Sequence, residues 1–354
     1  MTREFPLHPE QIKAAETLST RVSRVLVTGA GGFLGKAVCR QLLSAGIEVV
    51  GIARSDYPAL KQLGVTMHRG DITDIASLEA AMQGCELVFH VASKAGVWGS
   101  RESYYGPNVT GAANVIEAAR QQGVKGIIYT STPSVTFAGE DESGIDESAP
   151  YAARFLNHYG ASKAEAEAMM LSAHCRDLRT VALRPHLIWG PEDPHLVPRV
   201  ITRGRAGRLK LVGREDKLVD TIYVDNAAHA HVLAAISLLK DDSPCGGKAL
   251  FLSNDEPVTM ADMLGRILAC DNQHQRLPRV PVGLAYAVGA LLEGVYGMLG
   301  KEEEPVITRF VARQLSCSHY YRIDAAKTLL GYRPLISLDE GLQRLKLSLQ
   351  DSQR

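Results

Sequence analysis

Residues 23–35 read SRVLVTGAGGFLG, a short apolar run followed by closely spaced glycines. The part from Ser23 to Thr28 is mostly apolar and β-branched, which is typical of a buried parallel strand. From Phe33 to Ala45 the apolar residues recur with the period of a helix. A strand that runs directly into a helix through glycines predicts a loop that binds phosphate groups. A strand-to-helix turn without a ligand is the alternative.

Each glycine of this loop has a separate predicted role. Gly29 permits the tight turn, and Gly32 lets the backbone come close to a pyrophosphate. Gly35 lets the helix pack closely on the strand. The N-terminus of the helix then offers unpaired N–H groups to the phosphates. The predicted phosphate-binding residues are Gly29, Gly32, Phe33, Leu34 and Gly35.

The next predicted strand, residues 47–53, indicates which nicotinamide cofactor fits the loop. In NAD-binding proteins of this architecture that strand usually ends in an acidic residue, which binds the adenosine ribose. Here the strand ends at Ala53, and Arg54 follows with a guanidinium that can bind a 2′-phosphate at two points. We therefore predict NADPH as the cofactor; a solvated loop charge is the alternative for Arg54. After a third strand, Asp71 and Ile72 are expected at the adenine.

A second motif, YGASK at residues 159–163, lies far downstream of the glycine loop. Tyr159 and Lys163 would lie one turn apart on a helix and face the same crevice. In the reductive direction the Tyr159 phenol would give its proton to a carbonyl oxygen. A free phenol has a pKa of about 10, and the Lys163 ammonium should lower that pKa. A surface helix pair without chemistry is the alternative.

The strand expected before this motif, IIYTST at residues 127–132, ends in hydroxyl groups. Its carboxyl end lies at the sheet edge where ligands bind in open α/β folds. Thr132 or its neighbour Ser131 would donate a hydrogen bond to the same carbonyl oxygen. Capping of the strand end is the alternative role of these hydroxyls. The predicted catalytic residues are Tyr159, Lys163, Thr132 and Ser131.

The composition is consistent with an α/β enzyme. The chain of 354 residues carries 39 basic and 39 acidic residues, and this neutral balance argues against nucleic-acid binding. Its six cysteines are scattered without CxxC spacing, so we expect reduced thiols and a cytoplasmic location. His229 and His231 are expected on different faces of a helix, so no metal site is predicted.

From residue 23 the predicted strands and helices alternate, which indicates an α/β fold with a doubly wound parallel sheet of the Rossmann type. We expect a dinucleotide-binding domain at 23–184, completed by about 219–240 after a stretch rich in Pro and Arg. Residues 1–22 form a polar extension with a short helix. A smaller, mostly helical substrate-binding cap is expected from 185–218 and 241–354. The predicted strands lie near 23–28, 47–53, 65–69, 86–91, 126–131 and 179–184.

Several motifs together resemble an extended short-chain dehydrogenase/reductase, from about residue 23 to the end of the chain. Within that superfamily, AGVWG at 95–99 and the ending YRID…LGYRP at 321–334 are similar to the 3β-hydroxysteroid dehydrogenase-like branch. The motifs shared with the superfamily are the glycine loop after Thr28, YTSTPSV at 129–135, Tyr159 with Lys163, Arg184-Pro185 and YVDN at 223–226.

The resemblance implies roles for individual residues. Tyr159 would be the proton donor and Lys163 the family's lysine. Thr132, where many relatives have Ser, would be the hydroxyl that polarises the carbonyl. Asn108 would support the helix or a water relay near the lysine. The cofactor contacts implied in addition to the glycine loop are Arg54, Asp71, Ile72, Ala92, Asn108, Tyr159, Lys163 and Pro185.

The resemblance also implies a substrate and partners. The chain looks most similar to bacterial reductases that convert long-chain 2-alkyl-3-oxoalkanoic acids to 3-hydroxy acids with NADPH in olefin biosynthesis. It implies a homodimer that associates with a condensing enzyme, a β-lactone synthetase and a β-lactone decarboxylase.

Two other functions remain as alternatives. One is a 3β-hydroxysteroid or sterol-4-carboxylate dehydrogenase that runs as an oxidation; Ala53 disfavours it, because oxidative members commonly prefer NAD and an acidic residue there. The other is a non-catalytic nucleotide-binding scaffold. Such scaffolds usually lose the tyrosine or the lysine, so the presence of Tyr159, Lys163 and Thr132 disfavours this function.

The cap is expected to enclose long alkyl chains and to bind one carboxylate. The apolar stretch 280–299 approaches the length of a membrane span, but Glu293 and several glycines argue against a crossing. We predict a buried helix of the cap; a lipid-facing entry helix, in peripheral membrane contact at most, is the alternative. The candidates to line the cavity are Leu284, Leu291, Leu292, Val295, Met298 and Phe310, and the candidates to hold the carboxylate are Arg184, Arg199 and Arg203.

Overall fold

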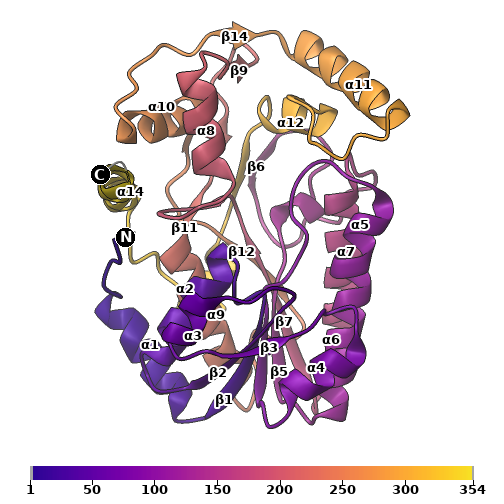
Figure 1. The fold of residues 1–354 in the computed structure, drawn as a ribbon, viewed down its shortest axis with the longest axis vertical. Helices are drawn as coiled ribbons and strands as arrows, with labels where there is room; N and C mark the ends of the chain where they lie inside the picture. The colour runs from indigo at the N-terminus through magenta and orange to yellow at the C-terminus, as the bar shows by residue number, and fades with distance from the viewer. Residues whose placement is uncertain (1–2, 353–354) are drawn as a thin grey trace.

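The structure is a computed structural model that describes residues 3–352, and a seven-stranded sheet forms its centre (Figure 1). The strand order is β3-β2-β1-β4-β5-β7-β12, and every neighbouring pair is parallel. The order reverses between β1 and β4, so the sheet is doubly wound and ligands are expected at its carboxyl edge. The strands are β1 Arg24–Thr28, β2 Glu48–Ala53, β3 Thr66–Arg69, β4 Leu87–His90, β5 Gly126–Thr130, β7 Arg179–Pro185 and β12 Ala249–Leu252.

Six of these strands match the sequence prediction, whereas β12 lies in a range expected to belong to the cap. That part of the expectation is wrong, because β12 pairs with β7 from Ala249 opposite Ala182 to Leu252 opposite Pro185. A four-residue apolar strand has no period that separates it from a buried helical turn. Its place at the edge of the sheet follows from its contact with β7.

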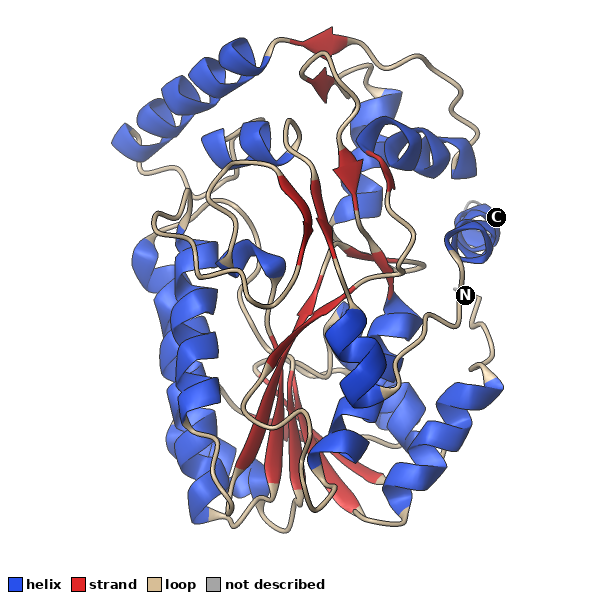
Figure 2. Ribbon diagram, turned by 180° about the vertical axis from the view of Figure 1, so that it is seen from behind, coloured by secondary structure: helices blue, strands red, loops and turns tan. Residues whose placement is uncertain are grey.

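Helices cover both faces of the sheet (Figure 2). On one face α2 (Phe33–Leu43) packs against α9 (Val224–Leu238). On the other face α4 (Ile75–Met82), α6 (Gly111–Gln121) and α7 (His158–Ser172) lie side by side. Because both faces are covered, the inner strands β1, β4 and β5 are buried along most of their length, as parallel strands usually are.

The glycine loop between β1 and α2 has the close contacts that its sequence predicts. Gly29 has a φ of 69°, and a Cβ atom there would lie 2.8 Å from the backbone of Ala92. A Cβ atom on Gly35 would overlap the carbonyl oxygen of Gly29. Glycine is therefore required at both positions, at one for the left-handed turn and at the other for the approach of the helix.

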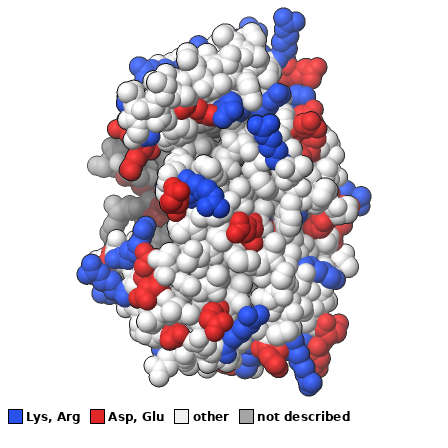
Figure 3. Space-filling model, turned by 90° about the vertical axis from the view of Figure 1, so that its right-hand side faces the viewer, with Lys and Arg blue, Asp and Glu red and all other residues white. Residues whose placement is uncertain are grey.

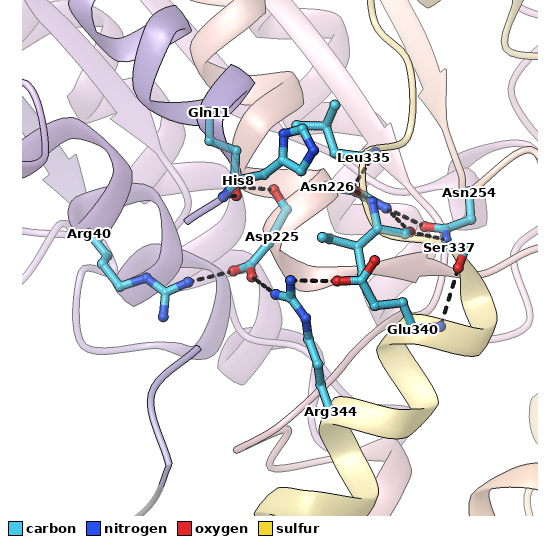
Figure 4. Close-up of polar contacts among 11 residues, drawn as sticks. His8, Gln11, Arg40, Asp225, Asn226, Asn254, Leu335, Ser337, Glu340 and Arg344 are labelled. Carbon is cyan, nitrogen blue, oxygen red and sulfur yellow. Dashed lines mark hydrogen bonds and ion pairs between the residues drawn. The ribbon is translucent and has the colours of Figure 1, made fainter. Parts of the chain in front are cut away.

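The N-terminal extension packs against two helices of the dinucleotide-binding domain. Its helix α1 (Pro9–Ser19) packs on α2 and α9, and the Gln11 amide donates to the Asp225 carbonyl oxygen at 3.1 Å. The Asp225 carboxylate lies between Arg40 at 3.0 Å and Arg344 of the C-terminal helix at 3.4 Å (Figure 4). The N-terminal helix and the C-terminal helix are thus both joined to α9.

A cap stands above the carboxyl edge of the sheet (Figure 1). It is mostly helical, as predicted, and it also contains a small mixed sheet with the order β13-β10-β15-β6. Its helices are α8 Leu196–Arg205, α10 Met260–Cys270, α11 Val282–Met298 and α12 Arg309–Gln314. Its short strands are β6 Glu142–Ile145, β9 Leu211–Val212, β10 Leu218–Val219, β13 Val258–Thr259, β14 Arg279–Val280 and β15 His319–Tyr321. The remaining elements are α3 Pro58–Gln62, α5 Arg101–Tyr105, the π-helix η1 Gly106–Thr110, the 3₁₀-helix η2 Pro133–Val135, β8 Ile188–Trp189, β11 Ile222–Tyr223, α13 Asp324–Leu330 and α14 Leu338–Ser352.

Helix α11 is not buried, so the favoured expectation for residues 280–299 is wrong. Only Ala285 and Gly289 of this helix are buried. Seen from the side, the upper part of the molecule in Figure 3 has a broad area of uncharged atoms. No helix within residues 3–352 is long and apolar enough to cross a bilayer. The large exposed apolar side chains of this segment are Leu284, Val288, Leu291, Val295, Met298 and Leu299.

Candidate active site

A cavity of about 770 Å³ lies where β1, β2, β3 and β4 end. The turn after β1, the end of β2 and the residues that follow β2, β3 and β4 line it, together with Ser103 of the 101–105 helix and Pro107. Of the residues expected to bind the cofactor, Gly29, Gly32, Arg54, Asp71, Ile72 and Ala92 line this cavity. Sequence reasoning missed Gly31, Ser55, Tyr57, Thr73, Ser93 and Lys94, which also line it.

Arg54 lines the cavity directly after β2. Its side chain is exposed and pairs with no carboxylate among residues 3–352. The nearby acid, Asp56, instead pairs with Lys61 at 2.8 Å. After the neighbouring strand β3, Asp71 accepts hydrogen bonds of 2.9 Å from the N–H and hydroxyl of Thr73. A cationic group is therefore available at the cavity where an NAD-binding chain would have an acid.

At the residues predicted to bind phosphate, the loop offers backbone N–H groups rather than polar side chains. Leu34 lies on α2 with its side chain buried in the core, so only its N–H group can serve a ligand. Gly32 is the N-cap of α2, and the N-terminus of this helix is a site suited to anions. The Tyr57 ring covers Gly31, because a Cβ atom on that glycine would collide with it. A tyrosine in a short loop gave no sequence signal for this position.

Lys163 is buried on α7, which Asn157 caps by accepting from the Gly160 N–H at 2.9 Å. Its Nζ atom donates to the carbonyl oxygen of Thr130 at 2.6 Å and lies 4.2 Å from the centre of the Tyr129 ring. Burial lowers the pKa of Lys163 to about 7, against the opposing effect of the Glu167 carboxylate. The lysine can therefore hold or release a proton near neutral pH.

Tyr159 does not have the lowered pKa expected from its lysine neighbour. Burial raises the pKa of Tyr159, and a hydrogen bond with the Thr132 side chain lowers it by less. Lys163 does not contribute, because its ammonium is directed to the Thr130 carbonyl oxygen. The physical reason is that desolvation favours the neutral phenol over the charged phenolate. A neutral phenol is the form that a proton donor needs.

Of the two candidate hydroxyls, Thr132 is the one beside Tyr159. The Thr132 hydroxyl also accepts from the Ser134 N–H at 3.2 Å, at the start of η2. Ser131 is buried, and its hydroxyl has no hydrogen-bond partner among the described residues. The geometry thus favours Thr132 for the role of polarising a carbonyl.

The catalytic candidates lie beside the cavity rather than in its lining. Lys94, a lining residue, places its ammonium 4.9 Å from the Tyr104 ring centre, and the rings of Tyr104 and Tyr159 are 6.4 Å apart. Asn108 accepts from the Lys94 N–H at 2.7 Å and donates to the Ser162 hydroxyl at 2.9 Å. Asn108 therefore joins the cavity wall to α7. Pro185 ends β7 on the same edge of the sheet.

The three arginines expected to bind a substrate carboxylate already have partners within the protein. Arg184 is buried and pairs with Glu167 at 2.6 Å. Arg199 pairs with Glu304 at 2.8 Å, and Arg203 donates to the Val306 carbonyl oxygen. The expectation is wrong for Arg184, because its charge is neutralised inside the protein. Two other arginines, Arg154 and Arg313, line a separate cavity of about 350 Å³ and have no carboxylate partner within the described residues.

Residues 26–280 match the 3-beta hydroxysteroid dehydrogenase/isomerase family. The chain belongs to this family. Its members are nicotinamide-dependent oxidoreductases that act on hydroxyl groups, so the predicted enzyme class is confirmed.

The relatives within the family include two reductases and a sterol enzyme. A 2-alkyl-3-oxoalkanoate reductase of Shewanella oneidensis is 63% identical over 98% of this chain and 91% of its own length. One of Stenotrophomonas maltophilia is 45% identical over 92% of this chain and 99% of its own. A decarboxylating sterol-4-alpha-carboxylate 3-dehydrogenase of Mus musculus is 35% identical over 92% of this chain and 90% of its own.

The family fold is also seen in solved structures. The structure of MoeE5 in complex with UDP-glucose and NAD has a TM-score of 0.74 and 23% identity, and the match covers 94% of this chain and 100% of that one. This likeness confirms the Rossmann-type sheet with a C-terminal lobe.

Proposed function

We propose that the chain reduces 2-alkyl-3-oxoalkanoic acids to 2-alkyl-3-hydroxyalkanoic acids with NADPH, in a reversible reaction. The observation that carries this proposal is the 63% identity to a 2-alkyl-3-oxoalkanoate reductase over 98% of the chain. The intact tyrosine, lysine and hydroxyl candidates support a catalytic rather than a scaffold role.

In the proposed reaction the bound cofactor supplies a hydride to the carbonyl carbon. Tyr159 gives its proton to the carbonyl oxygen, and burial keeps its phenol protonated at neutral pH. The Thr132 hydroxyl donates a hydrogen bond to the same oxygen, which stabilises the developing negative charge. Tyr159 must regain a proton after each reduction, and Lys163, one turn further along α7 with a pKa of about 7, can supply it once its ammonium leaves the Thr130 carbonyl oxygen. The residues used in these steps lie just after β5 and in the first two turns of α7.

The choice of NADPH over NADH rests on Arg54. Its free, exposed guanidinium supports binding of a 2′-phosphate, and Ala53 leaves no carboxylate at the end of β2 to repel that dianion. The glycine loop would hold the pyrophosphate through N–H groups, with Asp71 and Ile72 at the adenine. Asn108, Tyr159, Lys163 and Pro185 would complete the nicotinamide end.

A sterol-type dehydrogenase is the second candidate function, and the 35% identity to the Mus musculus enzyme supports this candidate. One assay separates the two functions. Purified protein would be supplied with NADP⁺ and a long-chain 2-alkyl-3-hydroxy acid, or with NAD⁺ and a 3β-hydroxysterol-4-carboxylate. Turnover of the hydroxy acid supports the reductase proposal, whereas turnover of the sterol alone would replace it.

We further propose that the enzyme is a cytoplasmic homodimer that works with the condensing enzyme, β-lactone synthetase and β-lactone decarboxylase of long-chain olefin biosynthesis. The similarity to reductases of this substrate class supports the assignment. Unpaired thiols at all six cysteines are consistent with a reducing compartment. Size-exclusion chromatography with the purified pathway enzymes tests both the dimer and the association.

We also propose that the outer face of α11 rests on a lipid surface from which a waxy substrate enters. This face carries only apolar and small residues, and the one charged residue of the helix, Glu293, turns inward to pair with Arg309 at 2.6 Å. At the end of the helix the Trp98 and Tyr296 rings meet edge to face, and Lys301 lies 5.0 Å from the Tyr296 ring centre. Aromatic rings and a lysine beside an apolar face suit the boundary between lipid and water.

A further inference from the structure

A buried histidine, His231 on α9, is joined to the end of strand β5. Its Nε2 atom lies 2.8 Å from the Thr130 hydroxyl, and its Nδ1 atom lies 2.7 Å from the carbonyl oxygen of Ala227. The side chain is fully buried, and the proposed reaction makes no use of it. The companion histidine, His229, is also buried and contacts Gln41 instead. His231 is therefore the histidine of this helix that reaches the carboxyl edge of the sheet.

The hydrogen-bond partners determine the state of this ring. The Ala227 carbonyl oxygen can only accept, so Nδ1 of His231 carries a proton. Burial lowers the pKa of His231 to about 4, which leaves the ring neutral at physiological pH. In a neutral ring with a proton on Nδ1, the Nε2 atom is an acceptor. The Thr130 hydroxyl consequently donates its hydrogen to His231.

Thr130 connects this histidine to the catalytic lysine. The residue uses its hydroxyl toward His231 and its carbonyl oxygen toward Lys163, whose Nζ atom donates to it at 2.6 Å. Thr130 is the last residue of β5, and the two candidate hydroxyls follow it directly. The position of the Thr130 carbonyl oxygen therefore sets the direction of the lysine side chain.

We propose that His231 is a positioning residue of the active site, which fixes Thr130 through its hydroxyl so that the Thr130 carbonyl oxygen orients Lys163. The expected effect of this positioning on turnover rests on the proposed reductase function. Three side chains also contact the ammonium or act on it: Tyr129 on β5, Glu167 on α7, and His90 at the end of β4. The contribution of His231 is the fixed acceptor, because an acceptor that stays in place favours the charged form of the lysine.

The test compares His231→Leu with His229→Leu, a matched control two residues earlier on the same helix. Both variants remove a buried imidazole, but only His231→Leu leaves the Thr130 hydroxyl without its acceptor. We expect His231→Leu to lower the pKa of Lys163 by about half to one pH unit, the size of one hydrogen bond. In kinetics the pH profile of kcat should move by the same amount, with KM for the cofactor changed less. His229→Leu should leave the profile in place, and His231→Gln, which keeps an acceptor, should partly restore it.

A double-mutant cycle shows whether the effect passes through Thr130. Thr130→Val removes the donor of the same bond, so His231→Leu with Thr130→Val should be no worse than the more damaging single variant. Lysine titration followed by NMR in labelled protein reports on Lys163 without turnover. If the wild-type protein turned over no hydroxy acid, the proposed function would fail while this titration still tested the role of His231. Equal shifts of the Lys163 pKa in the two histidine variants would overturn the inference. An unchanged pH profile of kcat in His231→Leu would overturn it too.

Discussion

Arg184 and Glu167 form a buried ion pair that joins β7 to α7, with guanidinium-to-carboxylate distances of 2.6 and 3.0 Å. Tyr151 donates to the same carboxylate at 2.9 Å. Glu167 lies one turn beyond Lys163 on α7, so the pair holds α7 against the sheet. An arginine that a substrate carboxylate was expected to use is thereby part of the protein's framework.

Loss of one partner of this pair should destabilise the fold strongly. Arg184→Met leaves the Glu167 carboxylate buried and uncompensated, which typically costs about 3–5 kcal/mol. Arg184→Met combined with Glu167→Leu should recover much of that loss, because no charge is left unpaired. Urea unfolding of the three proteins measures the difference. If the single variant were as stable as the wild type and only its KM for the acid rose, Arg184 would bind substrate after all.

Tyr159→Phe should abolish proton donation while it leaves the cofactor cavity intact. We expect kcat to fall by about a hundredfold to ten-thousandfold, with NADPH affinity close to that of the wild type. Steady-state kinetics followed by the absorbance of the reduced nicotinamide measure turnover, and fluorescence titration measures NADPH binding. Tyr105→Phe, a change on the neighbouring α5, is the control and should retain activity. A Tyr159→Phe enzyme with most of its activity would remove Tyr159 from the mechanism.

Arg54→Ala should affect NADPH much more than NADH. Its guanidinium is the cation proposed to pair with the 2′-phosphate, and the loss of such a charge-assisted contact raises KM for NADPH by about tenfold to a hundredfold. KM for NADH should change little, since NADH has no 2′-phosphate. Arg120→Ala, at an exposed arginine on α6, is the control for a change in surface charge. Equal losses with both cofactors would contradict the assignment.

Lys163 should make stability depend on pH in a defined direction. Its pKa falls from 10.5 to about 7 on folding. Between these values the unfolded chain holds a proton that the folded chain has released, so stability rises with pH, by about 1.4 kcal/mol per pH unit from this group. Urea unfolding of the wild type and Lys163→Met at about pH 7.5 and about pH 9 measures this dependence. The wild type should gain more stability than Lys163→Met; equal gains would show that the lysine is charged in the fold.

Substitutions on the outer face of α11 should weaken contact with lipid. Leu291 is 67% exposed and Met298 is 90% exposed, so Leu291→Ser and Met298→Ser change the surface and not the core. We expect each to lower partition onto phosphatidylglycerol–phosphatidylethanolamine vesicles by about tenfold. Val306→Ser, at an exposed apolar residue off the helix, is the matched control. A wild-type protein that fails to sediment with vesicles would end the proposal, and dimer loss in these variants would point to a second copy on this face.

Local patterns in the sequence are sufficient for much of the fold. The strand, the glycine turn and the helix at residues 23–35 are specified by neighbours in the chain, because each glycine permits a tight turn or a close backbone contact within a few residues. Six strands of the sheet follow from short apolar runs in the same way. Tyr159 and Lys163 were predictable as a pair because helical geometry places residues four apart on one face.

Contacts between distant segments could not be predicted from the same patterns. An apolar helix such as α11 has the same sequence signal whether another element covers it or solvent meets it, and only the packing of the cap exposes Leu291. Arg184 meets Glu167, and Thr130 meets His231, across separations of 17 and 101 residues. Burial then sets the pKa of Tyr159 in the opposite direction to that expected from Lys163. The sequence alone determined which chemical groups the chain carries and the local elements that hold them, whereas only the tertiary structure decided which groups meet and which are desolvated, because both depend on distances that folding creates.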